Sequence, residues 1–352
     1  MRIFDYSFLR SAALPARLVN ITSGISSLKT AADIRQNDYA KAYTEMEAIA
    51  KLQSVKGSNE IEGIVTSDAR IRAIVNQNSA PLNHDEAEIA GYRDALNGIH
   101  TGFETIEFRE DTILSLHEIM LRYTGESSGG YYKTEDNVIL AVDSSGLRSV
   151  RFRPTPAKDT PDAMEQLLLA YAEGKGDTAI HPLLLIPCVI LDFLCVHPFA
   201  DGNGRISRLL SLLLLYKSGY NVGKYVSFEE HINSHKGAYY EALRSSSDEW
   251  AEGKNSYIPY MENFLFTLLL CYQELDRRFS VVQDKRATKK ARIEATVENS
   301  LTPISKAELC AMHPDISPTT VEAVLGAMVK DGRIRRIGAA RASRYIKATN
   351  RS

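Results

Sequence analysis

The chain has 352 residues, of which 44% are hydrophobic and 24% are charged, and its formal net charge is −2. This length predicts a principal domain with its own core plus one or two smaller units. The near-neutral total hides an asymmetry: residues 281–352 contain 14 Lys and Arg against 7 Asp and Glu. The tail is therefore basic and the remainder of the chain acidic.

The sequence carries no sign of secretion or membrane insertion. The first residues, MRIFDYSFLR, lack the long apolar stretch of a secretory signal, and the other apolar runs are too short and interrupted to span a bilayer. The four cysteines form no CxxC pair, and three of them lie in apolar helical runs, where a thiol packs as a small hydrophobe. We therefore expect a cytoplasmic protein in a reducing compartment, with no membrane contact.

The first hundred residues read as helices. Between residues 14 and 96, leucine, isoleucine and alanine recur every three and four positions, and strand formers are few. One helical segment ends in the pattern Ser58-x-x-x-Glu62-Gly63. Taken alone, this pattern is also compatible with an ordinary helix terminus.

Residues 108–128 continue as helix, and we expect His117 within them to be a packed or surface histidine rather than a catalytic one. The character changes between residues 129 and 156. A pair of glycines is followed by the apolar run 138–142, an Asp-Ser-Ser-Gly turn and a second run at 150–153. This order predicts a β-hairpin with its loop around residues 144–146.

The most informative stretch is residues 197–208, HPFADGNGRISR, between two strongly apolar runs. Pro198 disfavours helical backbone at His197, so the helix predicted from residue 183 should end at the histidine. A second helix should begin near Asn203. Such a loop offers glycines for close backbone approach, free amides at a helix N-terminus and arginine donors, which together suit phosphate groups.

The side chains of this loop have distinct chemical uses. Asp201 is a hard oxygen ligand, and Mg²⁺ is usually held by one carboxylate plus the phosphates of its substrate. His197 is placed to take a proton from an attacking hydroxyl, and Phe199 should anchor the loop in the core. The alternative is an ordinary helix–loop–helix corner in which His197 and Asn203 only cap helices.

The stretch matches the HxFx(D/E)GNGRxxR signature position by position and therefore resembles the Fic proteins, which transfer AMP from ATP to a protein hydroxyl. The resemblance covers about residues 10–280 and implies a mainly α-helical core with a β-hairpin flap. It implies that His197 is the base and that Asp201 holds Mg²⁺ against the α- and β-phosphates. The implied nucleotide-binding residues are Gly202, Asn203 and Gly204, which present donors to anionic oxygens, and Arg205 and Arg208, which bind the β- and γ-phosphates.

The resemblance also assigns a role to the Ser58–Gly63 pattern, which is similar to an inhibitory motif of many Fic proteins. It implies that Glu62 pairs with Arg208 and keeps this arginine from the γ-phosphate of ATP. A carboxylate and a phosphate oxygen compete for the same guanidinium donors. Ser58 is then expected to support the Glu62 carboxylate by a hydrogen bond.

Two further segments acquire roles by resemblance. The hairpin corresponds to the flap, where Val138, Ile139 and Leu140 pair with the backbone of the target segment by strand addition. Tyr240 resembles the tyrosine that borders the adenine. The family often has an asparagine seven residues after it, where this chain has Ser247. Ordinary helix packing of Tyr240 is the alternative, as a plain edge hairpin is for the flap.

The charged stretch 273–292 is predicted to be a surface helix that links two domains. After it, Ser305-Lys-Ala-Glu308 is a capping box, and Ser317-Pro318 opens another helix that ends at Gly332. Two short strands, 333–337 and 343–346, follow. Helix, turn, helix and a basic two-stranded wing resemble a winged-helix domain, and the wing contains Arg333, Arg335, Arg336, Arg341 and Arg344.

We therefore expect an N-terminal helical region with the inhibitory helix (1–100), a Fic core (101–280) and a winged-helix-like domain (281–352). The predicted activity is transfer of AMP from Mg-ATP to a Ser, Thr or Tyr hydroxyl of a target protein or of the chain itself, inhibited by Glu62. The alternatives are removal of AMP by the same site and a DNA-binding regulator with a Fic core. The target, the activating signal, a DNA or protein partner of the winged helix and a homo-oligomeric state stay open.

Overall fold

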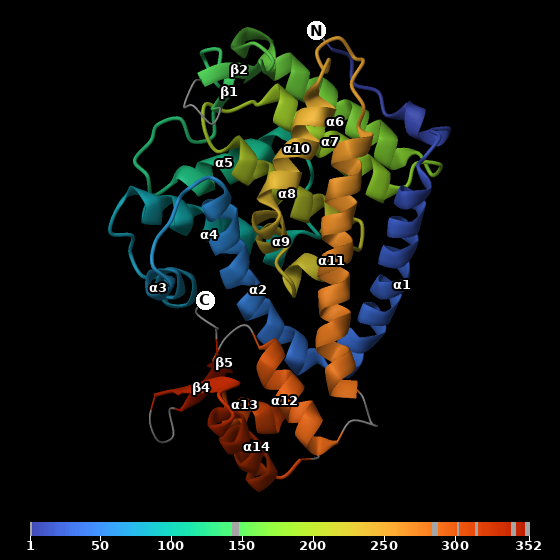
Figure 1. The fold of residues 1–352 in the computed structure, drawn as a ribbon. Helices are drawn as coiled ribbons and strands as arrows, with labels where there is room; N and C mark the ends of the chain where they lie inside the picture. Colours follow the sequence, from blue (N-terminus) through green and yellow to red (C-terminus); the bar gives the residue numbers. More distant parts are fainter. Residues whose placement is uncertain are drawn as a thin grey trace. The chain divides into compact units, whose positions relative to one another are not determined.

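The computed structural model describes residues 2–142, 148–283, 288–300, 303–313, 316–338 and 343–348, most of them in helices (Figure 1). The chain divides into two compact units. Unit 1 contains residues 1–29 and 46–271, and unit 2 contains residues 30–45 and 272–352. The three-part division expected from the sequence stays a prediction. None of the described helices is long and apolar enough to cross a membrane.

Helices α1, α2 and α11 contribute residues to both units, and the other helices before α12 belong to unit 1 alone. The first three are α1 (Ala16–Asp38), α2 (Ala40–Ile61) and α11 (Ile258–Gln283). The others are α3 (Asp68–Gln77), α4 (His84–Gly102), α5 (Glu110–Leu121), α6 (Thr160–Gly176), α7 (Pro182–Val196), α8 (Asn203–Lys217), α9 (Phe228–Ser234) and α10 (Lys236–Ser247).

Helices α7 and α8 form the buried centre of unit 1, and nearly all of their side chains are inaccessible to solvent. The α7 helix starts with His181 as its N-cap, whose Nδ1 accepts the Leu183 N–H at 3.2 Å, and with Pro182 in the first turn. It ends at Val196, directly before the His197–Pro198 pair, as predicted. The α8 helix begins at Asn203, also as predicted, so the signature loop joins two core helices.

The N-terminal segment is fastened to α7 through a buried carboxylate. Asp192 accepts hydrogen bonds from the Tyr6 hydroxyl at 2.8 Å, from the Trp250 Nε1–H at 2.7 Å and from the Tyr257 hydroxyl at 2.8 Å. Burial raises the pKa of Asp192, and these donors act in the opposite direction. The network therefore joins α7 to the N-terminal segment, 186 residues earlier in the chain, and to the segment around Trp250, 58 residues later.

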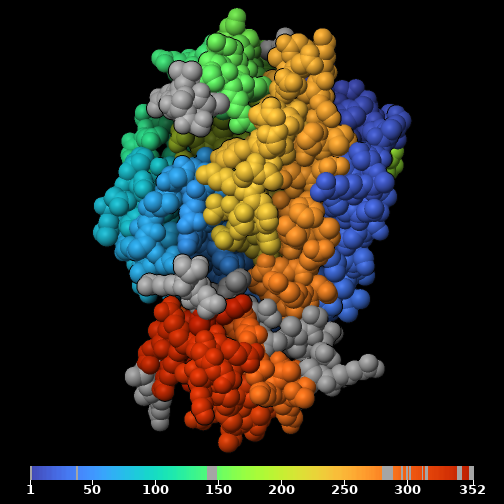
Figure 2. Space-filling view, viewed as in Figure 1, coloured from blue at the N-terminus to red at the C-terminus, as the bar shows by residue number. Residues whose placement is uncertain are grey.

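The first part of α1 lies beside the first part of α11, as the ribbon and the space-filling views both show (Figures 1 and 2). Arg17 reaches across to α11, where its Nη1 lies 3.8 Å from Glu262 Oε2 and its guanidinium carbon 5.9 Å from the centre of the Phe266 ring. These contacts are largely exposed and stabilise the pair only modestly.

The predicted hairpin is confirmed. Strands β1 (Ile139–Val142) and β2 (Arg148–Phe152) pair antiparallel, with Leu140 opposite Val150 and a register irregularity between Ile139 and Leu140. The loop predicted at residues 144–146 lies outside the described residues. Val138, Leu140 and Val150 are 42%, 45% and 46% exposed, so the hairpin presents apolar side chains to solvent.

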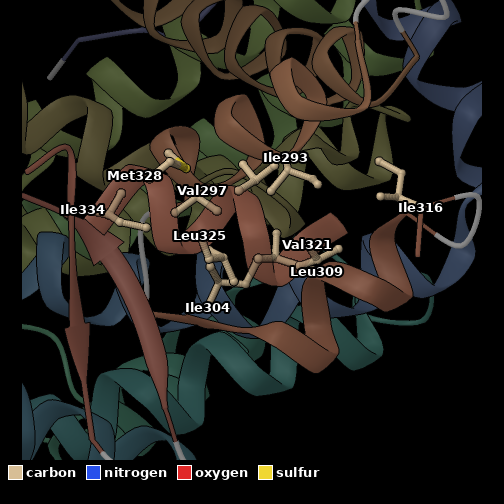
Figure 3. Packing of buried hydrophobic residues seen from close by; sticks show 10 residues of the cluster. Ile293, Val297, Ile304, Leu309, Ile316, Val321, Leu325, Met328 and Ile334 are labelled. Carbon is tan, nitrogen blue, oxygen red and sulfur yellow. The ribbon is translucent and has the colours of Figure 1, made fainter. Parts of the chain in front are cut away.

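Unit 2 has its own apolar core beneath a small sheet. Its C-terminal helices are α12 (Lys289–Asn299), α13 (Lys306–Met312) and α14 (Pro318–Lys330), and the strand order is β3 (Ile304–Ser305), β5 (Arg344–Lys347), β4 (Ile334–Ile337), all antiparallel. The capping box of Ser305 and Glu308 is confirmed. Figure 3 shows the core, which contains Ile293, Val297, Ile304, Leu309, Ile316, Val321, Val324, Leu325, Met328 and Ile334.

The prediction of a surface helix at residues 273–292 is wrong for its first part, residues 273–283, and residues 284–287 lie outside the described residues. The first part of this stretch belongs to α11, where Leu275 and Phe279 are buried and the Phe279 ring stacks on Tyr43 at a centroid distance of 5.0 Å. The charged residues of this stretch suggested an exposed helix. In the structure they occupy one face of α11, while the apolar residues recur with the helical period on the opposite, buried face. Helix α12 begins only at Lys289.

Three of the wing arginines, Arg333, Arg336 and Arg344, bind groups inside unit 2. Arg333 Nη2 lies 2.6 Å from Glu298 Oε1, Arg344 Nη1 lies 3.2 Å from Glu308 Oε1, and Arg336 Nε donates to Ser343 Oγ at 2.8 Å. Arg341 lies outside the described residues. The elements predicted for the winged helix are present, whereas the winged-helix interpretation itself stays a prediction.

Candidate active site

The signature loop begins with His197 in an unusual backbone conformation. His197 is the C-terminal cap of α7 and has a φ of 52°, in the left-handed region. Its Nδ1 lies 3.1 Å from the Leu194 carbonyl oxygen. Because a carbonyl oxygen only accepts, Nδ1 carries the proton, and in the neutral ring Nε2 keeps its lone pair. His197 is therefore prepared to act as a base through Nε2.

The electrostatic surroundings favour the neutral form of this ring. Burial lowers the pKa of His197, and the positive charge of Lys133 lowers it further. The hydrogen bond to Leu194 and the carboxylates of Glu62 and Asp201 act in the opposite direction without reversing the shift. The imidazole is consequently unprotonated near neutral pH, which a general base requires.

Asn203 closes the loop on itself. Its side-chain oxygen accepts the Phe199 N–H at 2.9 Å, and its side-chain nitrogen donates to the Phe199 carbonyl at 2.8 Å. Phe199 is fully buried, as predicted for a core anchor, and its ring stacks on His117 at a centroid distance of 3.8 Å. The Asn203 side chain therefore holds the loop. Its backbone amide is one of the first-turn amides of α8, which have no acceptor within the helix.

His117 has a part in the site that the sequence did not reveal. Its Nδ1 accepts the Gly130 N–H at 3.1 Å, so Nε2 carries the proton and donates to the Asp201 carbonyl at 3.2 Å. Burial lowers the pKa of His117 to about 4, which keeps the ring neutral. The prediction of a packed histidine is confirmed, and the ring also orients the loop at Asp201.

Glu62 reaches the site from the end of α2. The Gly63 N–H donates to the Glu60 carbonyl at 3.1 Å and the Ile64 N–H to the Asn59 carbonyl at 3.0 Å, which is a Schellman ending. Gly63 has a φ of 84°, a conformation that glycine adopts without strain. The pattern that ends the helix thus leaves the Glu62 side chain directed to α8.

The Glu62 carboxylate lies over the first turn of α8. Its Oε1 is 2.7 Å from Arg208 Nη2, so the predicted pairing of these two residues is present in the structure. A Cβ at Gly204 would collide with the same oxygen. Glycine at 204 is therefore required for the carboxylate to occupy this place, which is also where the positive end of the α8 dipole attracts anions.

Arg208 is held mainly by α2 itself. Its Nε donates to Ser58 Oγ at 2.8 Å and its Nη2 to the Ser58 carbonyl at 2.9 Å. Burial by itself lowers the pKa of Arg208, but Glu62 and two tyrosines outweigh it and the pKa is raised. The sequence predicted that Ser58 supports the Glu62 carboxylate; the structure corrects this, because the Ser58 oxygens accept from the guanidinium.

Arg205 is buried, and its partners are two carboxylates. Its Nη2 donates to Asp201 Oδ2 at 3.0 Å, and its Nη1 forms an ion pair with Glu88 Oε2 on α4. Glu88 was not predicted, since it precedes the loop by more than a hundred residues. Phosphate binding by Arg205 stays a prediction, and the arrangement shows that Glu88 helps to fix its guanidinium.

Asp201 is the candidate metal ligand, and its side chain is 68% exposed. Within the described ranges, no three or more His, Cys, Asp or Glu side chains are grouped so that they could hold a metal ion. An accessible single carboxylate nevertheless fits the arrangement in which Mg²⁺ takes most of its remaining ligands from phosphates and water. The magnesium role of Asp201 stays a prediction.

Tyr240 lies on α10, which is connected to the hairpin through the Tyr240 carbonyl. Burial raises the pKa of Tyr240 to about 12, and the Lys236 ammonium lies 5.8 Å from the centre of its ring. The Tyr240 carbonyl accepts from Arg151 Nη2 at 3.1 Å, which connects α10 to β2. Tyr240 is half-buried whereas Tyr239 is buried, so Tyr240 is the more accessible ring. Its contact with adenine stays a prediction.

Residues 107–215, which include all of α5 to α7 and most of α8, match the model of the Fic/DOC family. The chain contains a Fic/DOC family domain. Its most similar relatives include protein adenylyltransferase Fic of Nematostella vectensis, which is 25% identical over 181 residues. A Fido domain-containing protein of Dictyostelium discoideum is 31% identical over 101 residues.

These curated relatives are matched only in part. The match with the Nematostella protein covers 49% of this chain and 39% of that protein, and the match with the Dictyostelium protein covers 28% and 66%. Among solved structures, a Fic family protein of Desulfovibrio desulfuricans aligns over 97% of this chain and 98% of its own, with a TM-score of 0.60 and 20% identity. That similarity shows that the Fic fold is shared.

Proposed function

We propose that this chain transfers AMP from ATP to a hydroxyl group of a protein. The observation that carries the proposal is the contact of His197 Nδ1 with the Leu194 carbonyl oxygen at 3.1 Å, which leaves Nε2 as the proton acceptor. The first-turn amides of α8 and the Arg208 guanidinium lie in the same loop–helix unit. The name of the Nematostella relative, protein adenylyltransferase Fic, supports this reaction class.

The reaction follows from these positions. His197 Nε2 takes the proton of the attacking hydroxyl, whose oxygen forms a bond to the α-phosphorus of ATP. The bond from this phosphorus to the bridging oxygen breaks, and pyrophosphate leaves with its electron pair. The amides of Gly202, Asn203 and Gly204 stabilise the charge that develops on the phosphoryl oxygens, and Arg205 and Arg208 bind the β- and γ-phosphates. Mg²⁺, when held by Asp201, supplies further neutralisation of that charge.

Glu62 inhibits this reaction. Its carboxylate accepts from Arg208 Nη2, the donor that the γ-phosphate requires, and lies against Gly204 at the helix N-terminus. Two anions do not share this place, because each needs the same donors and repels the other. Transfer therefore requires that the Glu62 side chain leaves the first turn of α8.

The test offers the protein ATP, GTP, CTP or UTP, each labelled, with Mg²⁺, and follows mass increments on the chain itself. We expect an AMP increment from ATP, and a loss of at least ~10²-fold in His197→Ala, the usual effect of removing a general base. Circular dichroism and nucleotide binding serve as controls for folding. Transfer at the wild-type rate by folded His197→Ala would refute the mechanism, and release of AMP from modified protein would favour hydrolytic removal of AMP by the same site.

A further inference from the structure

The segment 133–137, just before the hairpin, forms hydrogen bonds to the backbone around His197; these bonds are called the grip below. The Lys133 N–H donates to the Pro198 carbonyl at 2.9 Å. The Lys133 side chain turns to the other side of the histidine, where its Nζ donates to the Val196 carbonyl at 3.2 Å and to Asn137 Oδ1 at 2.9 Å. Lys133 is only 5% exposed, so these bonds form away from water.

Asn137 completes the grip. Its side-chain nitrogen donates to the Phe199 carbonyl at 3.1 Å, while its oxygen accepts from Lys133. The carbonyls of Val196, Pro198 and Phe199, which flank His197 on both sides, therefore all accept from one five-residue segment. Such hydrogen bonds fix the orientation of three peptide groups around His197 more firmly than packing alone.

The backbone of His197 needs such support. Its φ of 52° lies in the left-handed region, which residues with a Cβ adopt rarely because the Cβ approaches the carbonyl oxygen. Conformations of this kind persist where the surroundings impose them, and they concentrate at functional sites. The hydrogen bonds from Lys133 and Asn137 are such surroundings.

Building on the proposed function, we propose that Lys133 and Asn137 are positioning residues for His197, which hold it in the conformation that its role as a base requires. Only one residue separates Asn137 from the start of β1, so the segment that fixes the base continues directly into the hairpin. The same segment therefore fixes both the position of His197 and the start of the strand that is proposed to bind the target. A small displacement of a reacting group is enough to lower a rate by ~10²-fold.

The charge of Lys133 also affects the pKa of His197, which can be measured independently of the rate. Burial lowers the pKa of Lys133 to about 8, so the ammonium is still mostly charged at neutral pH. Among the charged groups that act on His197, Lys133 lowers its pKa, whereas Glu62 and Asp201 raise it. Replacing Lys133 by an uncharged residue of similar length therefore raises the pKa of His197.

The test uses the full chain in a Glu62→Gly background, so that inhibition does not mask transfer. Lys133→Met should lower kcat by about 10- to 100-fold and change KM for ATP by less than about threefold, because positioning acts on the chemical step. Lys133→Arg should recover part of the loss. Asn137→Asp keeps the acceptor for Lys133 and removes the donor to Phe199, so it tests the second half of the grip independently.

Lys217→Met is the matched control. Lys217 also donates from a buried side chain to two backbone carbonyls, those of Phe103 at 3.3 Å and Glu104 at 3.4 Å, at the far end of α8 from the signature loop. It should lower the thermal unfolding temperature much as Lys133→Met does, and it should leave kcat unchanged. This comparison separates positioning from a general loss of stability.

A measurement that needs no activity accompanies the kinetics. The pKa of His197 is followed by NMR of ¹³C-labelled histidine, with the signal assigned from His197→Gln, and should rise in Lys133→Met. Unchanged kcat and unchanged His197 titration in folded Lys133→Met and Asn137→Asp would overturn the inference. Absence of any transfer by the Glu62→Gly protein would refute the proposed function instead, and the NMR titration would still decide whether Lys133 governs the histidine.

Discussion

Replacing Glu62 should activate the protein, and the structure allows the size of the effect to be worked out. The carboxylate is held by one hydrogen bond of 2.7 Å to Arg208, and its side chain is 32% exposed. A hydrogen bond to a charged group contributes about 1.5–3 kcal/mol, and partial exposure favours the lower part of this range. A gain of about 1.5–2 kcal/mol for the γ-phosphate corresponds to roughly 10- to 30-fold tighter productive binding of ATP.

Helix α2 ends at Ile61, so glycine at position 62 does not interrupt the helix, and Glu62→Gly should leave the fold intact. Glu62→Gln keeps the shape of the side chain and removes its charge, and we expect an intermediate activation. Adding Arg208→Ala should cancel most of the gain, because both changes act through the same contact.

The assay measures AMP incorporation and the apparent Kd for ATP of the wild type, both single variants and the double variant at matched protein concentration. Equal incorporation by the wild type and Glu62→Gly would show that Glu62 is not the inhibitory group. Full activation of the double variant would show that Glu62 acts through something other than Arg208.

Three other outcomes are expected. Gly204→Ala should stabilise the wild type less than it stabilises Glu62→Gly in urea unfolding, because the new Cβ displaces the Glu62 carboxylate in the wild type only; equal effects in both backgrounds would contradict the collision. The pKa of His197 is lowered and its neutral form is the base, so transfer should be retained above this pKa and lost as the pH falls through it. A pH–rate profile should show a midpoint below 6.5, and a lower midpoint in Glu62→Gly, because the Glu62 carboxylate raises the pKa of His197. Asp192→Ala should lower the free energy of unfolding by about 3–5 kcal/mol, followed through the fluorescence of Trp250, the only tryptophan, since three buried donors lose their acceptor; a loss below about 1 kcal/mol would show that they find other partners.

Features that depend on neighbouring residues were predictable from the sequence. Pro198 ends α7 directly before His197, Gly63 ends α2 directly before Glu62, and Ser305 with Glu308 opens α13, because each acts within one turn of its own position. The hairpin followed from its strand formers in the same way. The pairing of Glu62 with Arg208 spans 146 residues and came from a resemblance rather than from local chemistry.

Other features were decided only by the tertiary structure. Glu88 against Arg205, His117 beneath Phe199 and Lys133 beside the histidine carry no local pattern that marks them as part of the site. The surface helix predicted at residues 273–292 failed in its first part for the same reason, since its charges are local whereas the burial of its apolar side chains depends on distant partners. Backbone turns are determined by a few adjacent residues, but ion pairs and hydrogen bonds between helices exist only once the core has brought those helices together.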